Sequence, residues 1–229
     1  MKKWKECILA RVFFRFHPNM TIAPEIIVRI LDYFGVFTAA VAGTVLAKRQ
    51  QLDIFGAVMV AFATAIGGGT TRDLLLDRRP LFWLVDLNYA YLITATSIIT
   101  QIFYYQFERL DKPFRWFDAL GMATFTVIGI EIAQMRVVSP PVAVLMGVIT
   151  AVMGGILRDI ICRQVPLLLQ KEIYLTAALI GGIFYFILLR FGVELWLRDT
   201  LTLLLVLAIR VLAIIYNWNL PDIAIRRRR

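Results

Sequence analysis

Hydrophobic residues gather in long blocks along this chain, and polar and charged residues gather between the blocks. Seven of the blocks approach the roughly 20 residues that an α-helix needs to cross a bilayer. The pattern predicts transmembrane helices at about 25–46, 54–76, 86–107, 118–135, 142–162, 172–190 and 200–217. We therefore expect an all-α integral membrane protein with seven transmembrane helices.

The composition supports lipid as the solvent. Of the 229 residues, 60% are hydrophobic, whereas soluble domains are closer to half apolar. The net charge of +9 comes mostly from basic residues between the apolar blocks, which is typical of membrane-flanking loops and does not indicate a nucleic-acid partner. Cys7 and Cys162 are far apart and match no ligand or redox spacing, and His17 is the single histidine. We expect no cofactor, no metal site and no enzymatic activity.

An internal repeat appears when the chain is compared with itself at an offset of 86 residues. The matched pairs include Asp32 with Asp118, Gly35 with Gly121, Gly43 with Gly129, Thr64 with Thr150, Gly68-Gly69 with Gly154-Gly155, and Arg72-Asp73 with Arg158-Asp159. Each repeat contains three predicted helices, and because three is odd, the second repeat enters the membrane from the opposite side. The sequence predicts two inverted three-helix repeats and an additional seventh helix.

This division gives five segments along the chain. The first repeat covers 25–110, the second covers 111–195, and the seventh helix covers 196–219. Before them lies a tail, 1–24, which is either an interfacial helix or, in part, an over-long start with Met20 as the initiator. After them lies a basic tail, 220–229.

Glycines interrupt the second and fifth predicted helices at equivalent positions. Gly67, Gly68 and Gly69 lie in one of these helices, and Gly154 and Gly155 lie in the other. Glycine permits a kink or break, which in a membrane is tolerated where backbone is buried in protein or lines a wet cavity. Close helix packing is the alternative role. Because the glycines recur in both repeats, we favour a pathway through the membrane.

Hydroxyl groups near these glycines are candidate oxygen ligands for a permeating ion. They belong to Thr64, Thr70, Thr71 and Thr150. Backbone carbonyls exposed by the glycines are further candidates.

Charged residues directly follow both glycine motifs. Inverted repeats would bring Asp32 to the level of Arg72, and Asp118 to the level of Arg158, so that two ion pairs form. In the alternative arrangement, both arginines bind helix-end carbonyls while Asp73 and Asp159 face water.

Other charges also lie within the predicted helices. Glu131 lies near the end of the fourth helix. Arg210 lies near the middle of the seventh and would either form a structural ion pair or face the pathway.

The two motifs together resemble the paired signature of the trimeric intracellular cation channels, especially of their prokaryotic branch, whose repeated domain also carries the label of glycine transporter. The motifs read GGGTTRDLLLDRRPLFWL and GGILRDIICRQVPLLL, and the resemblance covers roughly 25–217. It implies a homotrimer of seven-helix subunits, each conducting monovalent cations such as potassium and sodium along its own pathway. It also implies that the glycines kink the second and fifth helices around the pore.

The function stays open between two classes at this point. One is a cation channel, and the other is a secondary transporter for glycine or another small solute, because inverted repeats with broken helices also occur in transporters. For location we expect a bacterial inner membrane. If Met20 is the true start, the positive-inside rule places the Arg226–Arg229 tail in the cytoplasm, where it would contact anionic lipid.

Overall fold

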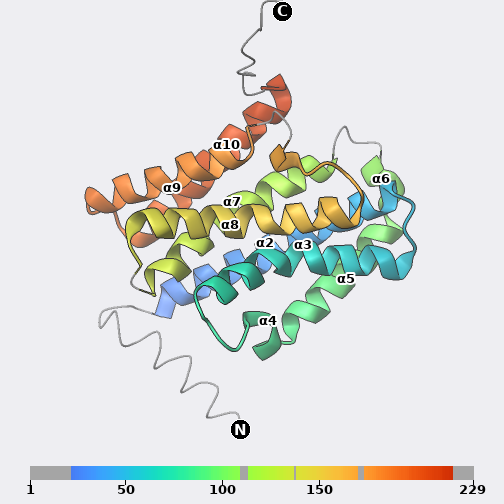
Figure 1. Cartoon of the computed structure of the whole chain (residues 1–229), viewed down its shortest axis with the longest axis horizontal. Helices are drawn as coiled ribbons and strands as arrows, with labels where there is room; N and C mark the ends of the chain where they lie inside the picture. Colours follow the sequence, from blue (N-terminus) through green and yellow to red (C-terminus); the bar gives the residue numbers. More distant parts are fainter. Residues whose placement is uncertain (1–21, 109–112, 137, 170–172, 219–229) are drawn as a thin grey trace, which may run out of the picture.

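The computed structural model describes residues 22–108, 113–136, 138–169 and 173–218. Over these residues the fold is all α-helical, as the sequence predicts (Figure 1). In chain order the elements are α2 (Ile22–Arg49), α3 (Ile54–Leu75), α4 (Phe82–Val85), α5 (Asn88–Ile102), α6 (Tyr104–Glu108), α7 (Pro113–Gln134), α8 (Pro140–Ile161), the 3-10 helix η1 (Leu167–Leu169), α9 (Leu175–Arg190) and α10 (Leu195–Tyr216).

Five helices in the described part of the chain are long and apolar enough to cross a membrane. They cover Arg29–Arg49, Ile54–Leu75, Phe114–Gln134, Pro140–Ile161 and Leu195–Tyr216. Each coincides with one of the predicted spans to within a few residues. The chain is therefore an integral membrane protein.

The other two predicted spans correspond to shorter helices. The block 86–107 forms α5, which has 15 residues, and the block 172–190 forms α9, which has 16 residues. Both are shorter than the roughly 20 residues that cross a bilayer of ordinary thickness. In the first block the helix stops at Phe103 and restarts as α6, a break that a hydrophobicity profile does not detect because the residues on both sides are apolar.

The helix predicted at 200–217 begins earlier than its apolar block indicates. α10 starts at Leu195, and its first two turns bury Arg198 and Asp199 at 7% and 5% exposure. Sequence reasoning placed the start near residue 200 because charged residues usually lie outside a membrane span. The two charges lie inside the helix because they pack against α7 and α9.

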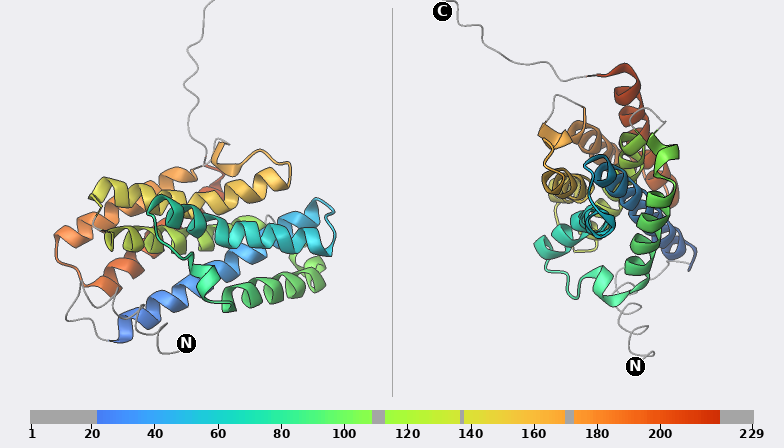
Figure 2. Two further views of the ribbon diagram at one scale, coloured as in Figure 1. Left: turned by 60° about the horizontal axis from the view of Figure 1, so that its bottom comes forward. Right: turned by 90° about the vertical axis from the view of Figure 1, so that its right-hand side faces the viewer.

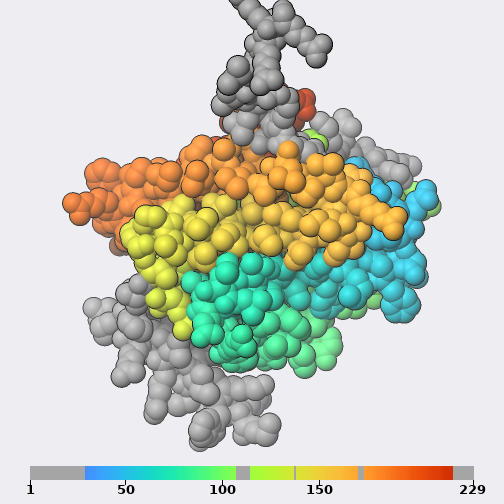
Figure 3. Space-filling view, in the orientation of Figure 1, coloured from blue at the N-terminus to red at the C-terminus, as the bar shows by residue number. Residues whose placement is uncertain are grey.

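Four helices form the centre of the molecule. α2 packs against α3 and α7, and α8 also packs against α3 and α7, so the four helices form a closed cycle of contacts (Figures 1 and 2). α5 covers α2 and α3, α9 covers α8, and α10 packs against α7 and α9. In the space-filling view, α8 crosses the visible face beside α3 (Figure 3). The predicted tails 1–24 and 220–229 lie wholly or largely outside the described residues.

Candidate functional site

The closest approach in the centre is a reciprocal contact between α3 and α8. A Cβ atom built on Gly68 would lie 2.0 Å from the backbone oxygen of Thr150. A Cβ atom built on Gly154 would lie 2.2 Å from the backbone oxygen of Thr64. No side chain fits at either position without moving a helix backbone. The glycines therefore set the distance between α3 and α8.

Glycines of α2 and α7 make similar close contacts with the same two threonines, at their hydroxyl groups. A Cβ atom on Gly43 of α2 would lie 2.5 Å from the Thr64 hydroxyl oxygen. A Cβ atom on Gly129 of α7 would lie 2.7 Å from the Thr150 hydroxyl oxygen. Glycines of α2 and α7 thus allow these helices to pack closely, and all four central helices meet around the two threonines.

The helices themselves do not break at the glycine runs. α3 is continuous from Ile54 to Leu75 and α8 from Pro140 to Ile161, so the predicted break is absent. Backbone hydrogen bonds are strong in a buried, low-dielectric setting, and close packing offsets the weak helix propensity of glycine. Of the flanking glycines, Gly67 faces Leu157, Gly69 faces the Phe82 ring, and Gly155 faces the Tyr174 hydroxyl.

The four candidate threonine hydroxyls all have hydrogen-bond partners in the structure. Thr64 and Thr150 each donate to the carbonyl four residues earlier in their own helix, at 2.6 Å. Thr71 donates to the Gly67 carbonyl at 2.9 Å, and Thr70 accepts from the Trp83 indole at 3.1 Å. Each hydroxyl that donates keeps lone pairs as acceptors, so it retains the chemistry of an oxygen ligand.

The charged residues of the second repeat form the predicted pair. Arg158 is fully buried, and its Nη1 donates to Asp118 Oδ1 at 2.6 Å. Its Nε also donates to Asp159 Oδ1 at 2.8 Å, and the guanidinium lies over the Phe114 ring. The other Asp159 oxygen accepts from the backbone nitrogen of Leu167, which ties the loop after α8 to the cluster.

The predicted pair in the first repeat does not form. Arg72 donates through Nε and Nη2 to Asp73 at 2.9 and 2.7 Å, and Arg78 reaches the same oxygen at 3.5 Å. Asp32 instead accepts a hydrogen bond from the Tyr89 hydroxyl. The expectation of an Asp32–Arg72 ion pair was therefore wrong.

Neither repeat adopts the alternative arrangement either. Asp73 and Asp159 are buried, at 0% and 2% exposure, and neither faces water. The neighbouring carboxylate is the first partner that a buried arginine can reach, and pairing there lowers its desolvation cost. In the second repeat Arg158 binds both Asp118 and Asp159, whereas in the first Tyr89 satisfies Asp32 separately.

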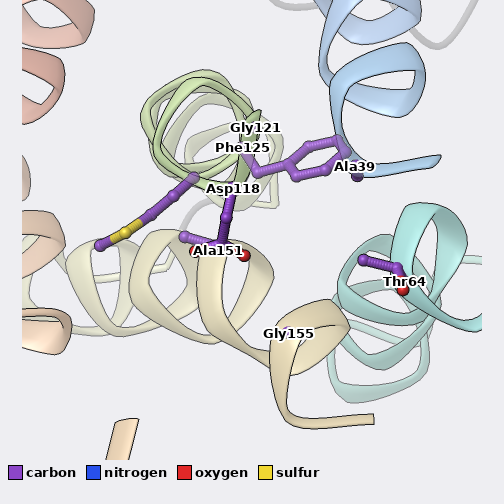
Figure 4. Close-up of a pocket in the computed structure, with 8 residues that line it drawn as sticks. Ala39, Thr64, Asp118, Gly121, Phe125, Ala151 and Gly155 are labelled. Carbon is purple, nitrogen blue, oxygen red and sulfur yellow. The ribbon is translucent and has the colours of Figure 1, made fainter. Parts of the chain in front are cut away.

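A small cavity lies next to the second cluster, where all four central helices meet (Figure 4). Its volume is about 10 Å³, close to the space that a single water occupies. The lining comprises Ala39, Thr64, Asp118, Gly121, Met122, Phe125, Ala151 and Gly155. Asp118 extends from α7 towards α8 in this view, and among the described residues its Oδ2 has no hydrogen-bond partner. The cavity thus brings a carboxylate to the helix crossing.

Sequence reasoning missed the aromatic residues of the site. Tyr89 binds Asp32, and the Tyr174 hydroxyl lies within hydrogen-bonding reach of Asp118, so each repeat has a tyrosine beside its first-helix aspartate. The signal was present, because Tyr89 and Tyr174 are 85 residues apart and an ungapped offset of 86 misses them by one position. A single-residue gap in the self-comparison would have revealed the pair.

Arg210 also belongs to the surroundings of the second cluster. It is fully buried, its guanidinium lies 4.5 Å from the centre of the Tyr174 ring, and its Nη1 donates to the Ile173 carbonyl at 2.8 Å. It thus holds the segment before α9 against α10.

Taken together, the central helices and buried charges define a polytopic helical membrane protein with a polar centre. Comparison with known proteins identifies its relatives. The family model described as "Glycine transporter" matches twice, over residues 29–105 and 115–190. The chain belongs to this family, that of the trimeric intracellular cation (TRIC) channels.

Several relatives are similar over nearly their whole length. A UPF0126 membrane protein of Vibrio cholerae is 37% identical over 226 residues, covering 96% of this chain and 92% of the relative. The UPF0126 inner membrane protein YadS of Escherichia coli K12 is 38% identical over 200 residues, covering 85% and 95%.

Solved structures share the fold. The TRIC channel orthologue from Rhodobacter sphaeroides has a TM-score of 0.79 and 33% identity, covering 84% of this chain and 99% of that one. A prokaryotic TRIC channel crystallised in 0.5 M KCl has a TM-score of 0.77 and 30% identity, covering 86% and 100%.

Proposed function

We propose that this protein is a channel for monovalent cations such as potassium and sodium, with a pathway through each subunit at the crossing of α3 and α8. The observation that carries the proposal is the buried Asp118 carboxylate, which faces a cavity at that crossing and has one oxygen without a partner among the described residues. A carboxylate oxygen together with nearby hydroxyl and carbonyl oxygens favours a cation over an anion or an apolar solute.

The cavity as it stands is too small for continuous conduction. Its volume of about 10 Å³ fits a closed pathway, in which the glycine contacts hold α3 against α8. Opening would require a small separation of these two helices. Gly67, Gly68, Gly69, Gly154 and Gly155 would then line the pathway together with Thr64, Thr70, Thr71 and Thr150, and a kink at the glycines would accompany opening.

Inverted repeats account for the reciprocal contact. Thr64, Gly68, Thr150 and Gly154 occupy equivalent repeat positions, and the contact of Gly68 with Thr150 mirrors that of Gly154 with Thr64. The double match of the family model supports two domains at 25–110 and 111–195. A seventh helix at 196–219 completes the proposed seven-helix subunit, in which α5 and α9 are short spans that thin the bilayer around them.

Assembly and location are further parts of the proposal. The related solved structures are described as trimeric channels or channel orthologues, which supports a homotrimer, and the inner-membrane relative supports a bacterial inner membrane. The basic tail at 226–229 would lie in the cytoplasm and contact anionic lipid. Reporter fusions to the C-terminus test this orientation, because a reporter active only outside the cytoplasm would contradict it.

A second candidate is a transporter of glycine, favoured by the family description. Reconstitution into planar bilayers and liposomes separates the two functions. A channel gives unitary currents under a potassium gradient, whereas a transporter gives saturable, ion-coupled glycine uptake without unitary currents. The Asp118→Asn variant should lower the cation current, and Asp118→Glu, which keeps the charge, should preserve more of it. Equal currents from wild type and correctly assembled Asp118→Asn would remove Asp118 from the pathway.

A further inference from the structure

A second group of buried polar side chains lies where α7, α9 and α10 meet, apart from the α3–α8 crossing. All its members are at most 7% exposed, and they are Glu131, Tyr185, Arg198, Asp199 and Thr202. Glu131 aligns with Val45 at the repeat offset, so the first repeat carries no acidic counterpart. The proposed cation pathway uses none of these residues, which leaves the burial of two acidic groups here without an explanation.

The two acidic groups contact each other. The carboxyl groups of Glu131 on α7 and Asp199 on α10 lie within hydrogen-bonding reach of one another. Ionised carboxylates only accept hydrogen bonds, so a bond between two of them requires a proton on one. Two adjacent carboxylates that share a buried site also repel strongly when both are ionised. A single proton shared by the two groups would remove this repulsion and allow a hydrogen bond between them.

The neighbouring Arg198 does not neutralise either carboxyl group through a direct ion pair. Arg198 lies 4.5 Å over the Tyr185 ring, and the ion pairs found among the described residues join neither Glu131 nor Asp199 to an arginine. Arg198 still acts on both carboxyl groups electrostatically. One proton leaves the pair with a single negative charge, which the single positive charge of Arg198 balances.

Further buried polar atoms lie close to Glu131 and Asp199 and could hydrogen-bond to a proton that moves to or from the pair. The Tyr185 hydroxyl and Asp199 Oδ1 are buried and have no hydrogen-bond partner among the described residues. The Tyr185 hydroxyl of α9 also interacts electrostatically with Glu131 and Asp199. Arg198 of α10 and Tyr185 of α9 are the ionisable groups that face the pair, and no group of α8 contributes among the described residues.

We infer that Glu131 and Asp199 form a proton-binding site that holds one exchangeable proton between α7 and α10 at neutral pH. Loss of this proton to the solvent places two negative charges in contact across the α7–α10 interface. The attachment of α10 therefore weakens as the pH rises through the range in which the pair deprotonates. The inference rests on side-chain contacts within one subunit and stands whether or not the protein conducts ions.

Infrared spectroscopy of the purified full-length protein in lipid nanodiscs tests the site directly. At neutral pH we expect a carbonyl stretching band of a protonated carboxylic acid that shifts in deuterated buffer. The band should disappear in Glu131→Gln and in Asp199→Asn, since an amide replaces one acid and the other then carries the charge. Asp77→Asn is the matched control, because Asp77 is 92% exposed and asparagine tolerates its left-handed backbone.

Thermal unfolding across pH gives an independent measurement. Wild type should lose thermal stability as the pH rises, whereas Glu131→Gln should lose less, because it cannot develop the second negative charge. The scans are repeated in sodium, potassium and choline salts. A band absent from wild type, or present and unchanged in both acid variants, overturns the inference. Stabilisation by sodium or potassium but not choline, without the band, would show that a metal cation occupies the site in place of a proton.

Discussion

Replacing Gly154 with alanine tests whether the α3–α8 distance is set by backbone contact. The new Cβ would lie 2.2 Å from the Thr64 backbone oxygen, and ordinary contact begins at 3.4 Å, so the two helices must separate by about 1.2 Å. The obstacle is backbone, so no side-chain rotation relieves it. Overpacking of a tight interior costs about 1–3 kcal/mol, and a clash with backbone belongs at the upper end.

The helix propensity of alanine opposes this cost. Alanine is about 1 kcal/mol better than glycine inside a helix, so the net destabilisation should be about 2 kcal/mol. Gly121→Ala is the matched control, because it has the same propensity gain while its Cβ meets nothing closer than the Thr38 hydroxyl at 3.2 Å. That variant should be neutral or slightly stabilised. Gly68→Ala should behave like Gly154→Ala, with a clash at 2.0 Å.

Equilibrium unfolding by sodium dodecyl sulfate in mixed micelles, followed by circular dichroism, measures these differences. The Gly68→Ala/Gly154→Ala double variant should lose less than the sum of the single variants, because the first substitution already separates the helices for the second. Equal stability of Gly154→Ala and Gly121→Ala, or strictly additive losses in the double variant, would refute the argument.

Further predictions concern the charges and the buried thiol. Asp118→Asn should cost about 2 kcal/mol in the same unfolding assay, because Arg158 loses a charged hydrogen bond and keeps only Asp159. Asp32→Asn should cost less than about 1 kcal/mol, because an amide oxygen still accepts from Tyr89, and it should show no coupling to Arg72→Gln in a double-mutant cycle. Burial raises the pKa of Cys162 to about 11, so in a Cys7→Ser background maleimide should label the folded protein slowly at pH 8 and the unfolded protein quickly. Because the unfolded thiol titrates first, near its ordinary pKa of 9.0, this group should lower the free energy of unfolding as pH rises from there towards 11, which unfolding at stepped pH would detect.

Patterns that repeat along the chain could be predicted well from the sequence. Hydrophobic blocks gave the long helices because burial in lipid depends on composition over about 20 residues. The glycines and threonines of the crossing were also recognised, because Gly68 and Gly154, and likewise Thr64 and Thr150, recur at one offset. The atoms that the glycines contact could not be predicted. Each glycine packs against a backbone carbonyl, and because every residue has one, the sequence does not indicate which carbonyl it will be.

Side-chain pairing was harder to predict because several partners lie at similar depth. Asp32 and Asp118 are equivalent by sequence, yet only Asp118 pairs with its arginine. Asp32 accepts a hydrogen bond from Tyr89 instead, a partner that self-comparison without gaps overlooks. Buried charges at helix ends were also placed outside the membrane, because hydropathy alone does not register that Arg198 and Asp199 pack against other helices.

The ion pairs have a consequence for how the chain enters the membrane as it is synthesised. The N-terminus of the chain emerges from the ribosome first, so the first repeat enters the membrane before α8 has been synthesised. The contact of Gly68 with Thr150 therefore cannot form until later. Arg72 and Arg158, in contrast, find ion-pair partners in chain that has already been or is just being synthesised. Arg72 pairs with Asp73, the next residue, and Arg158 pairs with Asp118 on a helix already synthesised, as well as with Asp159 beside it. The guanidinium groups of Arg72 and Arg158 can thus be neutralised as they enter the bilayer, whereas the contact of Gly68 with Thr150 cannot form until α8 has been inserted.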